Sequence, residues 1–194
     1  FVDVTDLGDG RYTLSNLLRG LNGSDPYMDG HYAGDLFILL DSDRITKYQP
    51  DSGEIGQDRY YRADTIGSDK EGVKKKLTLE GNSLKPWTVA GIAGTRDGSN
   101  NLTVTWHRRT RAYGEWMDGV ETVALNETSE SYEIDVIDSD GVTVLRTITA
   151  TEETCSYTAS QQTSDGLTPG DLIPLQIYQK NAVAGRGYMA EATV

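Results

Sequence analysis

Short segments in which apolar and polar residues alternate fill the second half of the chain, from residue 88 to residue 194. Seven such segments follow one another, separated by turn-forming stretches such as "DSDG" at residues 138–141. Alternation with period two places one set of side chains on each face of a strand, and regular turn signals separate neighbouring strands. This pattern restricts the fold more than any other feature, and it predicts a β-sandwich of seven short strands.

The predicted strands also predict a core. On the third strand, Tyr132, Ile134 and Val136 share one face, because side chains two apart point to the same side. Trp106 ends the second strand and Ile177 lies on the sixth, so both are expected to pack against that face. The seven strands are expected at residues 88–95, 100–106, 130–138, 142–150, 154–159, 171–181 and 187–194.

The chain ahead of the sandwich carries fewer strand signals. Asp9 and Gly10 separate two alternating segments within residues 2–14, which predicts a hairpin. We expect three further strands, and the lysines of the last are expected to coat an edge or a solvent face. These strands are residues 34–43, which we expect to be buried, and residues 59–67 and 73–81.

A domain boundary is expected near Pro86. The stretch "NSLKPW" at residues 82–87 combines a proline with small polar residues, as linkers do, and the sandwich pattern begins directly after it. The sequence therefore predicts an all-β chain of two domains. Residues 1–86 would form a small β-rich domain, and residues 87–194 would form the sandwich with one long loop at residues 107–131.

The opening stretch "YTLSNLLRGLNGSD", residues 12–25, has the composition of either a ligand loop or a structural corner. Ser15 can cap a short helical turn over residues 16–19, and Gly20 fits the left-handed position that ends it. Phosphate loops place their glycines before a helix, whereas these glycines follow the turn, so we expect a structural "LLRG" corner. Leu14, Leu17 and Leu18 would fill a small core, and Arg19 would pair with a carbonyl or a carboxylate.

The net charge of the chain restricts the classes of partner that it can bind. The 194 residues have a net charge of −12, with −4 in residues 1–86 and −8 in residues 87–194. Such a surface repels duplex nucleic acid, so no nucleic-acid partner is expected. No apolar run is long enough to predict a membrane span. Because the chain begins with Phe1, we expect a fragment of a longer polypeptide.

Residues with catalytic chemistry are few and scattered. The two histidines, His31 and His107, lie in different halves, and no G-x-S-x-G motif is present. Cys155 is the single cysteine and is expected to point into the core. The acidic turns lack the distal glutamate of an EF-hand loop, and the other carboxylates are read as solvated. We therefore expect no enzyme activity, no cofactor and no metal.

One basic cluster stands out within the long loop. "WHRRTRAYGEWMDG", residues 106–119, contains three arginines and two aromatic residues that suit contact with a glycan, a phosphate or a protein. The alternative is a hairpin packed on its own sandwich, with the arginines paired to local acids such as Glu115, Asp118 and Glu121. The candidate contact surface consists of Arg108, Arg109, Arg111, Tyr113 and Trp116.

Two resemblances follow from the order of these landmarks. The Trp that ends "LTVTW" and the Tyr that opens "SYEIDV" resemble the residues that pack between the sheets of fibronectin type III domains. The whole series, from "YTLSNLLRGLNGSD" through "HYAGDLFILLD", "YYRADTIG" and "KPWTVAGIAG" to "AVAGRGYMAEATV", is similar to the C-terminal part of tail hub or central tail fibre proteins. These proteins belong to long-tailed bacteriophages and gene transfer agents.

The second resemblance implies a function. It implies a non-enzymatic virion protein at the tail tip that supports tail assembly and host attachment. The chain would form a homotrimer, and this homotrimer would contact other tail tip proteins. Direct recognition of a host-surface glycan or receptor is the alternative. A third possibility is an accessory domain of an enzyme whose active site lies upstream. Burial of Trp87, Trp106 and Trp116 would weaken the glycan alternative, because sugar-binding sites expose aromatic faces.

Overall fold

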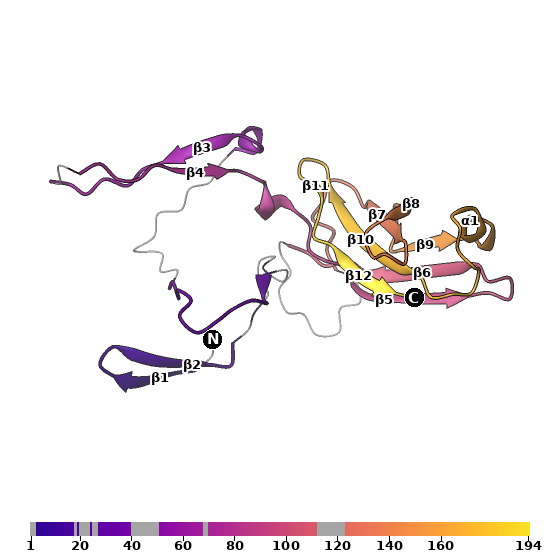
Figure 1. Cartoon of the computed structure of the whole chain (residues 1–194), viewed down its shortest axis with the longest axis horizontal. Coiled ribbons are helices and arrows are strands. Elements are labelled where there is room, and N and C mark those ends of the chain that lie inside the picture. The colour runs from indigo at the N-terminus through magenta and orange to yellow at the C-terminus, as the bar shows by residue number, and fades with distance from the viewer. Residues whose placement is uncertain are drawn as a thin grey trace. The chain divides into compact units, whose positions relative to one another are not determined.

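The computed structural model describes residues 3–17, 19, 24, 27–39, 51–67, 70–111 and 123–194. Strands dominate these residues (Figure 1), so the prediction of an all-β fold is confirmed. By its internal contacts the chain divides into two compact units, residues 1–37 and 38–194, which are described separately. The expectation that residues 1–86 and 87–194 are separate domains stays a prediction. Within the described ranges, no helix is long and apolar enough to cross a membrane.

The first unit contains a hairpin. Strand β1 (Asp3–Gly8) pairs antiparallel with β2 (Arg11–Ser15), as predicted. Asp9 and Gly10 form the loop and both have positive φ, at 55° and 73°. Two residues with positive φ match the right-handed twist of the strands that they join, which is why Asp-Gly suits this place.

The opening stretch differs from its prediction in two respects. Ser15 ends β2 and does not cap a helix, and Asn16 has a left-handed φ of 53°. Leu17 is 55% exposed, so the expected small core is wrong at this position. A two-stranded hairpin offers no second layer against which a leucine can pack. Arg19 does donate to a carbonyl, that of Met28, as expected, whereas Leu18 and Gly20 lie outside the described residues.

The buried strand predicted at residues 34–43 is wrong over its described part, residues 34–39. These residues form no strand, and Leu36 and Phe37 are 90% and 68% exposed. A strand needs a neighbour to satisfy its backbone groups and a layer to cover its side chains, and an apolar run supplies neither by itself. The remaining residues of the predicted strand lie outside the described ranges.

A second hairpin lies between residues 51 and 85. Strand β3 (Asp58–Tyr61) pairs antiparallel with β4 (Lys75–Thr78), between two short 3₁₀ turns, η3 (Ser52–Glu54) and η4 (Asn82–Leu84). The strands are shorter than predicted, and Arg59 is the only half-buried residue of the eight. The lysines of β4 are exposed, as expected.

Two antiparallel sheets make up the sandwich (Figure 1). One has the order β5 (Ala90–Arg96), β6 (Leu102–His107), β9 (Thr154–Tyr157). In the other, β8 (Val144–Ala150) pairs with β7 (Tyr132–Ile137), and β7 with β10 (Pro174–Asn181). Strand β10 also pairs with β11 (Gly185–Arg186) and β12 (Ala190–Thr193). The predicted two-sheet β-sandwich is thereby confirmed.

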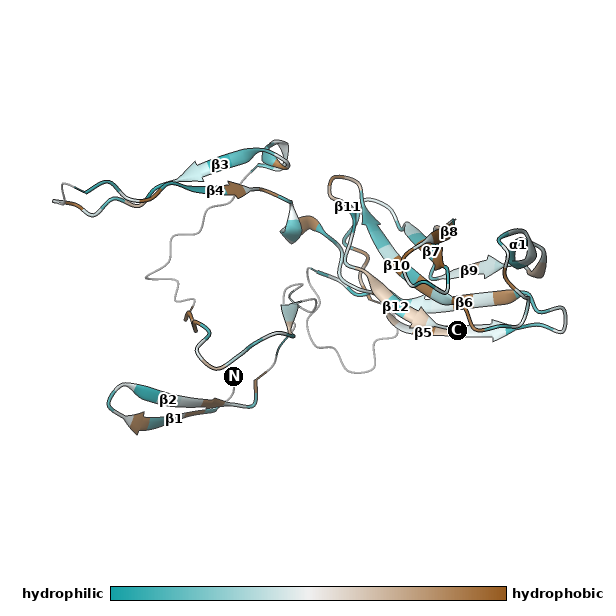
Figure 2. Cartoon of the chain, in the orientation of Figure 1, coloured by the Kyte–Doolittle hydropathy of each residue, from teal (hydrophilic) through white to brown (hydrophobic). Residues whose placement is uncertain are grey.

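The core lies between these sheets. Trp106, Tyr132, Ile134, Val136 and Ile177 are each at most 1% exposed, as predicted. Tyr132 stands edge-on to Trp106, with ring centroids 5.2 Å apart, a geometry that aromatic pairs favour. Figure 2 shows apolar segments on β6, β7 and β10, the strands that supply these side chains. Cys155 also belongs to this core, as expected.

The chain enters the sandwich at Pro86, which is buried. The Pro86 carbonyl accepts a hydrogen bond from the Tyr188 amide at 2.9 Å, next to the bond from the Gly187 amide to the Gln179 carbonyl. A Cβ on Gly187 would lie 2.5 Å from the Pro86 oxygen, so only glycine fits there. This contact fixes the start of the sandwich at one end of β10.

A short helix that the alternating pattern did not predict, α1, spans Ala159–Ser164. Thr158 and Gln161 form a capping box, in which each side chain bonds to the backbone of the other residue. Gln162 is fully buried and donates to the carbonyls of Asn100 and Tyr157, and its Oε1 accepts from Arg96. This one side chain therefore joins the β5–β6 turn to the end of β9.

Candidate contact site at the base of the long loop

The arginines singled out by the sequence follow directly after β6. That strand alternates strictly between buried and exposed residues up to His107 and leaves the sheet there. Arg108 and Arg109 are half-buried and Thr110 is buried, so the chain stays close to the sandwich as it enters the loop. Tyr113 and Trp116, the aromatic members of the predicted surface, lie outside the described residues.

Arg108 joins three segments of the sandwich. Its Nη1 donates to Glu130 at 3.0 Å and to Glu153 at 3.2 Å, and its Nε and Nη2 both donate to the Val123 carbonyl. The side chain is only 15% exposed. Glu130 also accepts from the Tyr132 hydroxyl at 2.9 Å, and burial raises the pKa of that hydroxyl. Arg108 therefore links the two ends of the loop to each other.

Arg109 lies over an aromatic ring. Its guanidinium carbon is 5.2 Å from the centroid of the Trp87 ring, and Nη1 donates to Thr88 Oγ1 at 3.0 Å. A cation over the face of tryptophan is attracted by the negative charge of the ring face. Trp87 is half-buried, so this arginine ties the loop to the segment that precedes β5 and leaves part of the ring at the surface.

Arg111 completes the anchoring. Its Nε donates to Glu127 at 2.8 Å, and the other oxygen of Glu127 accepts from the amide of Asn181 at 2.6 Å. The Glu127 side chain is 3% exposed, so this carboxylate is held on both sides within the protein. Beside it, Asn126 donates to the hydroxyl of Thr110. The entry and the exit of the loop are thereby linked to each other and to the end of β10.

Three described members of the predicted surface therefore already have partners within the chain. The described acids that they contact are Glu127, Glu130 and Glu153. The nearby acids expected from the sequence, Glu115, Asp118 and Glu121, lie outside the described residues. Two of the three contacted acids lie more than 18 residues from the arginine that they pair with, and Glu153 comes from the β8–β9 turn. Distance along the chain explains why adjacency in sequence did not find them.

A second charged network on the outer face of the larger sheet was not predicted. Arg186 donates to both oxygens of Asp135 and to Glu133, and its guanidinium lies 4.4 Å from the Tyr178 ring centroid. Lys180 also donates to Glu133. The only sequence signal was the alternation that placed charges at positions 133, 135 and 180, because Arg186, in the two-residue strand β11, falls between the strands that the pattern predicted.

The pKa values in this network follow from its hydrogen bonds. Burial by itself would raise the pKa of Asp135, yet the bonds from Arg186 and Thr147 lower it below its usual range. Bonds from Lys180 and Arg186 lower the pKa of Glu133. Both carboxylates are therefore ionised at neutral pH and held in place, as in a structural ion-pair network.

The described residues give little chemistry for catalysis. Cys155 is buried, and burial raises the pKa of its thiol to about 11, so it is a poor nucleophile at neutral pH. His107 is exposed, and its Nδ1 lies 3.6 Å from a carboxylate oxygen of Glu153. Over the ranges that the structure describes, no group of three or more His, Cys, Asp or Glu residues is placed to hold a metal ion.

Comparison with known protein families gives one match, at the start of the chain. Residues 1–38 match the family described as "Rcc01698-like, C-terminal". No curated protein matches the chain. The matched segment contains the β1–β2 hairpin and the described part of the "LLRG" stretch, and it ends before the second hairpin.

Several solved structures are similar to this chain. Domains d3–d4 of the rat CD45 extracellular region are 10% identical, with 99% of this chain and 94% of that chain covered and a TM-score of 0.38. The FN5 domain of Drosophila Lar is 13% identical, with 56% and 94% covered and a TM-score of 0.34. The FN1–FN3 domains of chicken CNTN1 are 13% identical, with 72% and 43% covered and a TM-score of 0.40. These values are too low to carry a functional argument.

Proposed function

We propose that this chain is a non-enzymatic structural and interaction module of a bacteriophage-type tail tip, part of a hub or central fibre that supports tail assembly and host attachment. The observation that carries the proposal is the exposure of apolar side chains ahead of Pro86. Leu36, Phe37, Ile38 and Leu39 are between 61% and 90% exposed, and Tyr32 is 77% exposed. Contiguous exposed apolar residues mark surfaces that a partner covers.

The sequence resemblance and the family match support this assignment. The resemblance to tail hub proteins spans nearly the whole chain, and the match at residues 1–38 is to the C-terminal part of a larger protein. In a hub, copies of the chain and neighbouring tail proteins would cover the exposed apolar residues that lie ahead of Pro86. A homotrimer at the tail tip of the virion is the assembly proposed.

The arginine segment, residues 108–111, has a defined place in this proposal. Its arginines hold the base of the loop through Glu127, Glu130 and Glu153, so their contribution to contact is to position the loop. The contact surface proposed from the sequence, Arg108, Arg109, Arg111, Tyr113 and Trp116, would then act as a unit whose arginines are its support.

The test replaces residues 36–39 by serine in the full chain. The sandwich should keep its circular dichroism and its melting temperature, whereas self-association in sedimentation and incorporation into tails should be lost. Val183→Ser is the matched control, because Val183 is 58% exposed on the sandwich. A variant that still assembles into infectious particles would contradict the proposal, as would cleavage of a glycan by the wild-type chain.

Recognition of a host-surface glycan or receptor is a second candidate. It is favoured by Trp87, which is half-buried with Arg109 over its ring. Trp106, in contrast, is fully buried in the core and cannot contact a sugar. Trp87→Ala should abolish binding to host envelope fragments while assembly persists. If that variant binds the fragments as strongly as the wild type, Trp87 is not part of a glycan-binding or receptor-binding site.

A further inference from the structure

The second hairpin, β3–β4, is basic in an acidic chain. Its two strands and the segment between them, residues 58–78, carry six basic and four acidic residues, a net charge of +2, whereas residues 87–194 carry a net charge of −8. Residues 70–78 alone carry four lysines and one glutamate. All eight strand residues except Arg59 are exposed. This local excess of positive charge contrasts with the rest of the molecule and attracts an acidic partner surface.

The lysines of this basic hairpin differ in their contacts. Lys76 pairs with Asp58 at 2.7 Å, which holds the strands together. Lys74 lies 5.9 Å from the centre of the Tyr60 ring, and among the described residues Lys75 makes no ion pair. Tyr60 and Leu77 are 61% and 51% exposed. The hairpin therefore presents lysines together with apolar side chains, the mixture found at protein contacts.

The sandwich has the opposite character. Each of its seven basic residues contacts a group of its own chain, as described for the arginine segment and for Arg186. Several carboxylates have no described basic partner. Asp138 and Asp140 bond to backbone amides of the β7–β8 turn, and Glu191 accepts only from the amide of Gln176.

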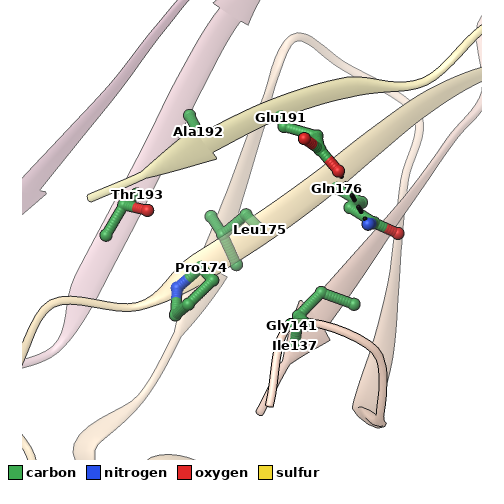
Figure 3. Close-up of a pocket in the computed structure, with 8 residues that line it drawn as sticks. All are labelled: Ile137, Gly141, Pro174, Leu175, Gln176, Glu191, Ala192 and Thr193. Carbon is green, nitrogen blue, oxygen red and sulfur yellow. Dashed lines mark hydrogen bonds between the residues drawn. The ribbon is translucent and has the colours of Figure 1, made fainter. Parts of the chain in front are cut away.

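One of these carboxylates, Glu191, lines a hollow, the end hollow (Figure 3). It has a volume of ≈ 400 Å³, and Glu191 and Gln176 lie along one side of it, facing the turn that contains Ile137 and Gly141. Asp138 and Asp140 belong to that same turn. Next to the lining residues in sequence, Val142 and Leu172 are 80% and 76% exposed. The end hollow thus combines apolar lining residues with the carboxylate of Glu191, and an acidic turn adjoins it.

We propose that the basic hairpin of one copy docks into the end hollow of a second copy. Charge complementarity carries the choice of occupant, since lysines with tyrosine and leucine would meet Glu191, the neighbouring acidic turn and the apolar lining residues Ile137 and Pro174. The chain enters the sandwich beside Gln179, whereas the end hollow lies at Pro174, the opposite end of β10. This separation favours the hairpin of a neighbouring copy. The contact is head-to-tail, and its repetition gives a closed ring when the rotation between neighbouring copies closes.

Charge reversal on each side tests the contact in the full chain. The inferred contact rests on the proposed function only because both assume that copies of the chain assemble. The hairpin variant is Lys74→Glu with Lys75→Glu, which leaves the internal Lys76–Asp58 pair intact. The matched control is Arg11→Glu with Lys85→Glu, which changes the net charge equally at other sites. The hollow variant is Glu191→Lys with Asp138→Asn, where the asparagine keeps the acceptor that the turn uses.

Sedimentation measures the association constant, and circular dichroism checks folding. We expect the hairpin variant and the hollow variant each to weaken association by about tenfold or more, and the control to have little effect. Combining the two variants should restore part of the loss. Added salt should weaken the wild-type contact.

Two results would overturn the inference. If both variants associate as strongly as the wild type, this contact is excluded. Self-association would then still occur, so the proposed function would stand. A wild-type chain that stays monomeric at every concentration would exclude a contact between two copies. Incorporation into tails would then decide the proposed function separately.

Discussion

Strands were predicted both before and after Pro86, but the strands that the structure forms there have different surroundings. In β6 the apolar residues alternate into a core where Leu102, Val104 and Trp106 are each 1% exposed. In β3 and β4 the same alternation leaves Tyr60 and Leu77 more than half exposed. A two-stranded ribbon cannot bury either of its faces, whereas two facing sheets bury one face of each. The comparison teaches that an apolar residue in a strand is stabilising only when a second layer covers it.

The difference has a consequence for stability and for assembly. The sandwich should unfold as a cooperative unit that owes its stability to its own core. The hairpins should gain their stability from a partner, so their apolar residues should matter for association and little for the unfolding of the isolated chain.

The largest expected effect separates the two regions at one aromatic residue each. Trp106→Ala should lower the free energy of unfolding of the sandwich by about 3–5 kcal/mol, as large aromatic deletions in cores do. Tyr60→Ala should leave it unchanged. Denaturant unfolding followed by circular dichroism measures both. Equal effects from the two variants would break the comparison.

A smaller effect is expected from the outer face of the larger sheet. Arg186→Met leaves Asp135 buried without its cation, and the loss should be about 1.5–3 kcal/mol, near the lower value because Arg186 is 39% exposed. Arg11→Met, at an exposed position of β2, is the control. Chemical denaturation at neutral pH would detect the difference.

The same network predicts how stability depends on pH. Because folding lowers the pKa of Asp135 and Glu133, their contribution is present above the ordinary values of 3.8 and 4.5. It is lost as the pH falls through the lowered pKa values. The wild-type sandwich should therefore lose stability in acid, and Arg186→Met should lose less. A variant that follows the wild-type curve in parallel would show that Arg186 does not set these pKa values.

The capping box of α1 provides a test of stability within the sandwich. Thr158→Ala removes the side chain that accepts from the Gln161 amide at the start of α1, and it should destabilise the sandwich by about 1 kcal/mol. Thr158→Ser keeps the acceptor and should restore most of that stability. A melting temperature that is the same for all three proteins would mean that α1 contributes nothing to the sandwich.

The smallest expected effect on folding lies in the second hairpin. Leu77→Ala should change the free energy of unfolding of the isolated chain by less than about 0.5 kcal/mol, because the side chain is 51% exposed. Its effect should appear instead as weaker self-association in sedimentation. A large loss of folding stability would indicate that Leu77 is covered within its own chain.

Several features of the sandwich could be predicted from local pattern alone. Period-two alternation located β6, β7 and β10, and the inward faces of these strands became the core. The helix α1 was missed although Thr158 and Gln161 carry a capping-box signal, because the surrounding residues lack an apolar face of helical period. The candidate contact site was predicted in position, but the partners of its arginines were not.

The sequence by itself determined which residues can alternate in strands, where turns fall and which side chains share a face, because these properties depend on neighbours along the chain. Tertiary structure decided the rest. It paired Arg108 with Glu153, 45 residues away, and Arg186 with Asp135, 51 residues away. It also covered Trp106 while leaving Leu36 and Phe37 exposed. Burial and ion pairing depend on which layers meet in space, and an alternating pattern does not specify whether a second layer is present.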